Sequence, residues 1–302
     1  MVHILQNDTW RVGVLPHTAA SLAFAQIQHG GEWCDFMRPT PPEHQHEPLN
    51  CASYLLVPWS NRIRDAKFRF AGQAYQLQPS FADGTAIHGV GRHYAWQVIT
   101  AHDTHIRLEF DSRQHEQVNF PFAFRSWVEY TLDGQDFRTR LGVHNVDQRP
   151  MPAGFGTHPM LQRSLTQPDD LLSLELPFAK SYPLVNCLPV GEPVPVPTDL
   201  DYQRLRRAGD VFVDDCLTGR NMARNIMLKY DKSKVQIVHW LDFLYTHLVM
   251  YMPVGQSFIA LEPVTNANDG FNLAATGARD HGVFVLEPGE MREAMSGYTI
   301  TT

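Results

Sequence analysis

The chain has 302 residues, of which 43% are hydrophobic and 19% are charged, a composition typical of a globular protein with a substantial core. Its formal net charge of -7 disfavours nucleic acids and anionic membranes as partners, because binding to either depends on Lys and Arg. No apolar run approaches the roughly 20 residues that a membrane-spanning helix needs, and the first residues lack a basic segment followed by an apolar one. We therefore expect a cytoplasmic protein whose cysteines are free thiols.

Alternation of apolar and polar residues predicts strands from early in the chain. Residues 67–78 (KFRFAGQAYQLQ) predict two strands joined by a turn at Ala71-Gly72, and residues 105–110 predict another strand. Residues 125–146 predict a longer hairpin with its corner at Asp133-Gly134, because Asp-Gly tolerates positive φ at a tight turn.

The second half of the chain continues this pattern. The proline-rich segment 188–200 predicts a rigid extended loop, whereas residues 217–230 are the one place where we expect a short helical turn. Residues 247–263 predict two strands, and residues 282–300 predict a hairpin with Pro288-Gly289 at its corner. Many strands linked by turns predict an all-β fold, a large antiparallel β-sandwich, formed by a single domain over residues 1–302.

Five short segments place polar or ionisable side chains at ends or bends of predicted strands. Taken singly, each has a structural explanation, such as a salt bridge at a sheet edge, a buried histidine or a turn. Two features stand out, because Pro159 restrains His158 to extended geometry and Glu262 ends an apolar strand, where an unpaired buried charge is costly. The candidate residues are Asn61, Arg62, His88, His158, Asp214 or Asp215, and Glu262.

A metal site is not expected. His44 and His46 alternate in a proline-flanked segment, but no third ligand can be named, and the chain lacks both HExxH and Cys/His spacing.

The order of the five segments resembles the aldose 1-epimerase, or galactose mutarotase, family over nearly the whole chain. The matching stretches are NRIRDAKFRFAGQAYQL, IHGVG, GVHNVDQRPMPAGFGTHPM, VDDCLTG and LEPVTNANDGFN. The resemblance implies a galactose mutarotase-like sandwich with a sugar-binding groove on one sheet, and chemistry that uses no metal or organic cofactor. The implied partner is a small-molecule sugar.

The resemblance also implies roles for individual residues. Glu262 would be the general base and His158 the general acid, on opposite sides of a single hexose-sized cleft. The substrate would be held by Arg62, the adjacent Asn61, His88 and Asp214.

The chain departs from the family pattern after the His-Pro pair, where Met160, Leu161 and Gln162 replace an aromatic residue followed by Asn. This departure leaves the preferred sugar open. Three alternatives also stay open: a glycoside hydrolase with Glu262 and Asp214 as its carboxyl pair, a hexose-6-phosphate 1-epimerase, and a non-catalytic carbohydrate-binding or sensing protein. The sequence is compatible with either a monomer or a homodimer.

Overall fold

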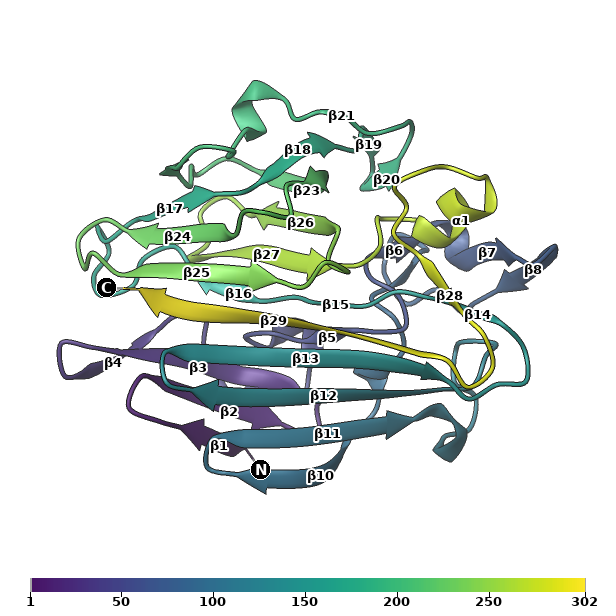
Figure 1. Cartoon of the computed structure of the whole chain (residues 1–302), viewed down its shortest axis with the longest axis horizontal. Coiled ribbons are helices and arrows are strands. Elements are labelled where there is room, and N and C mark those ends of the chain that lie inside the picture. Colours follow the sequence, from purple (N-terminus) through teal and green to yellow (C-terminus); the bar gives the residue numbers. More distant parts are fainter. Residues whose placement is uncertain (1, 302) are drawn as a thin grey trace.

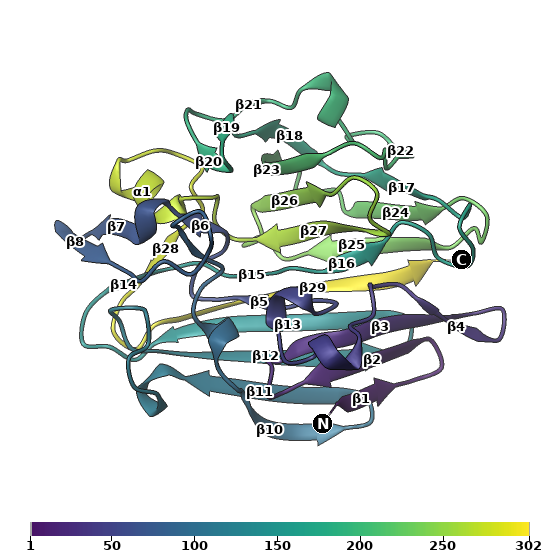
Figure 2. The same ribbon diagram turned by 180° about the vertical axis from the view of Figure 1, so that it is seen from behind.

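The computed structural model describes residues 2–301, which form three large antiparallel sheets and four two-stranded ones. The nine-stranded sheet extends from the bottom of the molecule into its upper half in Figure 1. Figure 2, the view from behind, shows a four-stranded sheet in the lower half and an eight-stranded sheet in the upper half. The predicted all-β sandwich is therefore confirmed.

The nine-stranded sheet has the strand order β10-β11-β12-β13-β29-β25-β24-β17-β22. The last strand, β29, lies between β13 and β25 and so joins two parts of the sheet that are distant in sequence. The strands are β10 (Gln97–His102), β11 (His105–Asp111), β12 (Phe124–Asp133), β13 (Asp136–Asn145), β17 (Leu172–Glu175), β22 (Arg206–Arg207), β24 (Ile226–Tyr230), β25 (Gln236–Leu241) and β29 (Met291–Thr301).

Strands β12 and β13 show how the alternation in sequence becomes a sheet with two different faces. Phe124, Val128 and Leu132 are buried, while Glu129 on the opposite face remains partly exposed. The two-residue turn after Asp133 begins with Gly134, whose φ of 56° suits glycine. The predicted hairpin is confirmed, with its corner one residue later than expected.

The other two large sheets lie behind the nine-stranded sheet. The four-stranded sheet contains β1 (His3–Gln6), β2 (Trp10–Leu15), β3 (Ser21–His29) and β4 (Glu32–Asp35), paired in that order. The eight-stranded sheet contains, in spatial order, β21 (Val194–Pro195), β18 (Phe178–Ser181), β23 (Val213–Arg220), β26 (His247–Met252), β27 (Phe258–Val264), β15 (Gly156–Thr157) and β5 (Leu55–Leu56), with β16 (Met160–Gln162) also paired to β27.

The remaining elements are short two-stranded sheets, 3-10 turns and a helix. The predicted hairpin of β7 and β8 is one of the two-stranded sheets. The two-stranded sheets are β6 (Arg62–Ile63) with β9 (Ala86–Ile87), β7 (Lys67–Phe70) with β8 (Gln73–Gln76), β14 (Met151–Ala153) with β28 (Phe284–Leu286), and β19 (Leu184–Val185) with β20 (Leu188–Pro189). The described residues also contain six 3-10 turns, at Pro42–His44, Pro48–Asn50, Arg64–Ala66, Gly91–His93, Ser112–Gln114 and Thr198–Leu200, together with one α-helix, α1 (Gly270–Ala275).

Two predictions about local structure are wrong. Residues 217–230 hold the end of β23 and all of β24 instead of a helical turn, since both segments find partner strands in large sheets. Residues 282–300 do not form a hairpin, because β28 pairs with β14 while β29 pairs with β13 and β25. In both places pairing with distant strands decides the structure.

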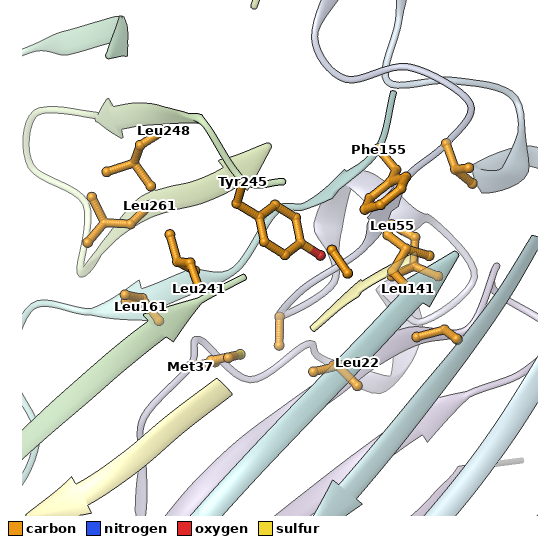
Figure 3. Close-up of a cluster of buried hydrophobic side chains, with 14 of the residues drawn as sticks. Leu22, Met37, Leu55, Leu141, Phe155, Leu161, Leu241, Tyr245, Leu248 and Leu261 are labelled. Atoms are coloured by element: carbon orange, nitrogen blue, oxygen red, sulfur yellow. The ribbon is translucent and has the colours of Figure 1, made fainter. Parts of the chain in front are cut away.

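The core lies between the sheets and is filled from all three of them. Figure 3 shows Leu161 and Leu261 from the eight-stranded sheet beside Leu241 from the nine-stranded sheet. In the same view Leu55 of the eight-stranded sheet lies beside Leu141 of the nine-stranded sheet, and Leu22 of the four-stranded sheet lies below them. Complete burial of a leucine side chain contributes about 1.5–3 kcal/mol, so this layer fixes how the sheets pack.

The eight-stranded sheet is buried on both faces. Along β27, Ile259 and Leu261 pack into the central core, while Ala260 and Val264 belong to a second apolar cluster. Because side chains alternate along a strand, Glu262 shares the outer face with Ala260 and Val264. Glu262 is nevertheless only 2% exposed, so this face is covered as well.

Candidate active site

A cavity of about 360 Å³ lies on the outer face of the eight-stranded sheet, a size in the range of small-molecule sites. Its walls combine residues of that sheet with residues from the loops between positions 49 and 88. All six predicted site residues line it. The full lining is Leu49, Tyr54, Asn61, Arg62, Phe81, Ile87, His88, His158, Met160, Phe212, Asp214, Tyr251 and Glu262.

Glu262 and His158 are in direct contact and buried, with 3.0 Å between Oε1 of Glu262 and Nε2 of His158. The carboxyl and the imidazole contact each other directly, instead of facing each other across the cleft as we expected. Oε2 of Glu262 and Nδ1 of His158 have no hydrogen-bond partner among residues 2–301. Burial raises the pKa of Glu262, and the nearby imidazole partly offsets this rise. A carboxyl and an imidazole are the side-chain groups that most often accept and donate protons in enzymes.

The position of the His158 imidazole is fixed by the chain around it. Its backbone N–H donates to the carbonyl oxygen of Tyr54 over 2.9 Å, and the Tyr54 ring stacks on the imidazole with 4.5 Å between ring centroids. His158 also lies between β15 and β16, both of which pair with β27, the strand that carries Glu262. The imidazole and the carboxyl thus come from adjacent segments of one sheet.

His88 stands beside this pair as a neutral imidazole. Burial lowers its pKa well below the ordinary value, and the His158 imidazole, 5.4 Å away between ring centroids, lowers it further. Its Nδ1 accepts the backbone N–H of Asn61 over 3.3 Å, so Nε2 carries the proton and is a hydrogen-bond donor. The bend that presents His88 requires Gly89, because a Cβ there would lie 2.0 Å from the Val57 carbonyl oxygen.

Arg62 and Asn61 form a polar wall of the cavity. The Arg62 Nε donates to Oδ2 of Asp83 over 2.8 Å, and its guanidinium lies over the Phe81 ring, 5.3 Å from the centroid. Asn61 adopts a positive φ of 54°, and its side-chain oxygen accepts the Arg62 backbone N–H over 2.8 Å. These contacts fix the guanidinium at the cavity.

The structure distinguishes between the two adjacent aspartates of β23. Asp214 lines the cavity, whereas Asp215 faces the other side of the strand and pairs in register with Met250 of the core. The Cys187 thiol donates to Oδ2 of Asp214 over 3.1 Å. Burial raises the pKa of Cys187 to about 11, with Asp214 adding to the rise, so the thiol keeps its proton at neutral pH.

Sequence reasoning missed several residues at the site. Tyr54, Asp83 and Cys187 lie in loops that reach the cavity only through tertiary packing. Tyr251 had a detectable signal, since it occupies an outward position on the predicted strand that precedes the Glu262 strand.

Two kinds of site are not found among residues 2–301. No three side chains of His, Cys, Asp or Glu gather in a way that would hold a metal ion. Within the same residues, no helix has the length and apolar character needed to cross a membrane.

Comparisons with known proteins agree with the fold. The family model described as aldose 1-epimerase matches residues 20–299. The uncharacterized protein YihR of Escherichia coli K12 is 24% identical over 242 residues, which cover 79% of this chain and 77% of YihR.

Solved structures show the same fold at lower identity. A galactose mutarotase-like protein from Clostridium acetobutylicum superimposes with a TM-score of 0.88 at 17% identity, covering 99% of this chain and 94% of that one. An aldose epimerase homologue from C. elegans gives a TM-score of 0.81 at 15% identity, covering 100% and 99% of the two chains. The family match spans most of the sequence, and the chain belongs to the aldose 1-epimerase family.

Proposed function

We propose that the protein is a mutarotase, which interconverts the α and β anomers of a free aldose with Glu262 as general base and His158 as general acid. The observation that carries this proposal is the 3.0 Å contact between the two side chains, both buried at one cavity. Family membership supports a carbohydrate epimerase, and the contact supports a particular acid and a particular base.

The reaction needs two proton transfers. The Glu262 carboxylate takes the proton from the anomeric hydroxyl, the C1–O5 bond breaks as C1 becomes an aldehyde, and the His158 imidazolium gives a proton to O5. Rotation about C1–C2 presents the other aldehyde face. O5 then attacks C1, its proton returns to His158, and Glu262 returns its proton to O1. A positioned acid or base typically contributes about 10²–10⁴-fold to such a step.

The separation of the two groups suits this chemistry. O1 and O5 are bonded to the same carbon, so their catalysts must lie close together instead of on opposite walls. Oε2 of Glu262 and Nδ1 of His158 have no partner among the described residues, and the alternative atoms of each group are bonded to one another. A sugar that enters would compete with the contact between Oε1 and Nε2.

The remaining polar side chains would hold the sugar. We assign the neutral His88 Nε2–H and the Arg62 guanidinium as donors to ring oxygens or hydroxyls, with Asn61 fixing the Arg62 backbone. Asp214 would accept hydrogen bonds from hydroxyls further round the ring.

The cavity favours a free aldose over a phosphorylated one. Arg62 is the one Lys or Arg among the described residues that line it, and Asp83 already neutralises its guanidinium. Asp214 and Glu262 add negative charge, so a phosphate dianion would meet net repulsion. We further propose that the protein acts in the cytoplasm as a monomer or homodimer, without nucleic acid or membrane partners.

Polarimetry on freshly dissolved α-D-glucose and α-D-galactose tests the function. The purified protein should accelerate the change in rotation, and Glu262→Gln should lower the rate by about 10³-fold or more with the fold intact. Glu293→Gln, a matched change at an exposed site on the nine-stranded sheet, should leave the rate within about twofold.

The same preparations separate the alternatives. An aryl glycoside should release no phenol, and glucose 6-phosphate should compete poorly with glucose. Wild-type rates in the Glu262→Gln protein would refute the assignment of the base. Sugar binding without any rate increase by the wild type would instead show a binding protein.

A further inference from the structure

We propose that this enzyme prefers 6-deoxy aldoses, in which a methyl group replaces the exocyclic hydroxymethyl group, over the parent hexoses. The inference rests on the proposed function and extends it to the substrate class. Its basis is the uneven distribution of polar and apolar side chains across the floor of the cavity.

Strand pairing gives the layout of that floor. Met160 of β16 pairs with Ala260 of β27, Ala260 pairs with Tyr251 of β26, and Tyr251 pairs with Asp214 of β23. These four residues form one row across the sheet, and three of them, all but Ala260, line the cavity. Glu262 lies one outward position further along the central strand β27. The row therefore has a carboxylate at one end and a thioether at the other.

The acid and the base fix how an aldose lies on this row. His158 precedes β16, so the imidazole is on the Met160 side of the β27 strand, while Asp214 is two strands away on the other side. If His158 protonates O5 and Glu262 serves O1, the O5 side of the ring points toward Met160. C5 and its C6 substituent follow O5 round the ring, and C2 and C3 with their hydroxyls point toward Asp214.

Beyond Tyr54 and His158, the residues that line the side of the cavity that would receive C6 are the apolar Met160 and Leu49. Met160 is 6% exposed and packs in the apolar cluster of the outer face. Leu49, in the 3-10 turn Pro48–Asn50, packs against the same cluster. Both side chains line the cavity. The Tyr54 ring is itself stacked on His158.

This environment discriminates between a methyl and a hydroxymethyl group. A methyl group at C5 gains contact with Met160 and Leu49, whereas a hydroxyl held against them loses its water without gaining an equivalent partner. Apolar pockets discriminate against one added hydroxyl by up to about 10²-fold. We therefore expect kcat/KM to favour each 6-deoxy sugar by about tenfold or more.

The test compares two matched pairs, 6-deoxy-D-glucose with D-glucose and 6-deoxy-D-galactose with D-galactose, by polarimetry at equal concentrations. The preference should appear in both pairs, because the two parents differ only at C4. Met160→Gln places an amide beside C6 and should lower the 6-deoxy preference by about threefold or more. Met222→Gln makes the same change at a half-exposed methionine outside the cavity and should leave the preference unchanged.

The outcomes separate this inference from the function on which it rests. Equal rates within each pair, or faster reaction of the parents, would overturn the preference while upholding the mutarotase activity. An unchanged preference in Met160→Gln would also overturn it; if that variant fails to fold, Leu49→Asn replaces it with the same expectation. No acceleration with any of the four sugars would overturn the proposed function, and this preference with it.

Discussion

The outer faces of the two largest sheets carry similar ionisable side chains in opposite surroundings. On the nine-stranded sheet, Arg107 and Arg125 lie 2.7 and 2.9 Å from Glu109, and all three side chains are between 20% and 43% exposed. On the eight-stranded sheet, Glu262 is 2% exposed and lies 3.0 Å from His158. Water screens the first group, whereas burial of the second raises the pKa of Glu262.

The difference comes from what covers each sheet. Strand alternation points a carboxylate outward on both, as Glu129 of β12 and Glu262 of β27 show. Loops from residues 49 to 88 extend over the eight-stranded sheet and bring Tyr54 and His88 to the pair. Covering a sheet face thus turns an outward carboxylate from a solvated ion-pair partner into a group suited to proton transfer.

The largest expected difference in kcat is between two histidine variants, one on the outer face of each large sheet. His158→Asn removes the proposed acid and should lower kcat by about 10²–10⁴-fold, because a positioned acid contributes that much. His144→Asn changes a partly exposed imidazole on the nine-stranded sheet and should leave kcat within about twofold. Polarimetry on both variants, with thermal unfolding as a folding control, measures the contrast. Equal losses would show that the covered face has no special role.

The pH profile sharpens the comparison. Glu262 must be ionised to accept a proton, and burial raises its pKa above the ordinary 4.5, so the acidic limb of kcat/KM should have its midpoint above pH 4.5. The imidazole lowers that pKa, so the residual activity of His158→Asn should have its acidic limb at higher pH than the wild type. A limb at or below pH 4.5, or one that moves down in the variant, contradicts this account.

A smaller effect, on KM, is expected when the two adjacent aspartates on opposite faces of β23 are compared. Asp214→Asn removes an acceptor at the cavity and should raise KM by about tenfold, since a hydrogen bond to a charged group is worth roughly 1.5–3 kcal/mol. Asp215→Asn, the adjacent change on the opposite face, should leave KM nearly unchanged. Steady-state rates across a range of sugar concentrations separate KM from kcat. A larger KM change in Asp215→Asn would mean that the wrong aspartate has been assigned.

The sequence predicts the parts of the fold that depend on neighbouring residues. The β7–β8 and β12–β13 hairpins follow from alternation and turn residues, and both are confirmed. The position of β29 between β13 and β25 was not predictable from such patterns. Strand pairing over long separations leaves little local signal, and for the same reason residues 217–230 were wrongly expected to hold a helical turn. A single domain over residues 1–302 stays a prediction.

The candidate site likewise has features that the sequence predicts and contacts that it does not. The order of the segments predicted that Glu262, His158 and Asp214 would share a site, and all three line one cavity. Their catalytic and binding roles stay predictions. The Tyr54 stack on the imidazole and the Cys187 thiol on Asp214 were not foreseen, because each joins a loop to a distant strand.

The central claim is that residues 262 and 158 act together on one anomeric centre, and a double substitution tests it most directly. Polarimetric kcat values should be compared for Glu262→Gln, His158→Asn and the protein that carries both changes. Groups that act as a unit lose their effect together, so the double variant should be within about threefold of the slower single variant. A double variant whose loss equals the product of the two single losses would show that the groups act independently and would contradict the proposed mechanism.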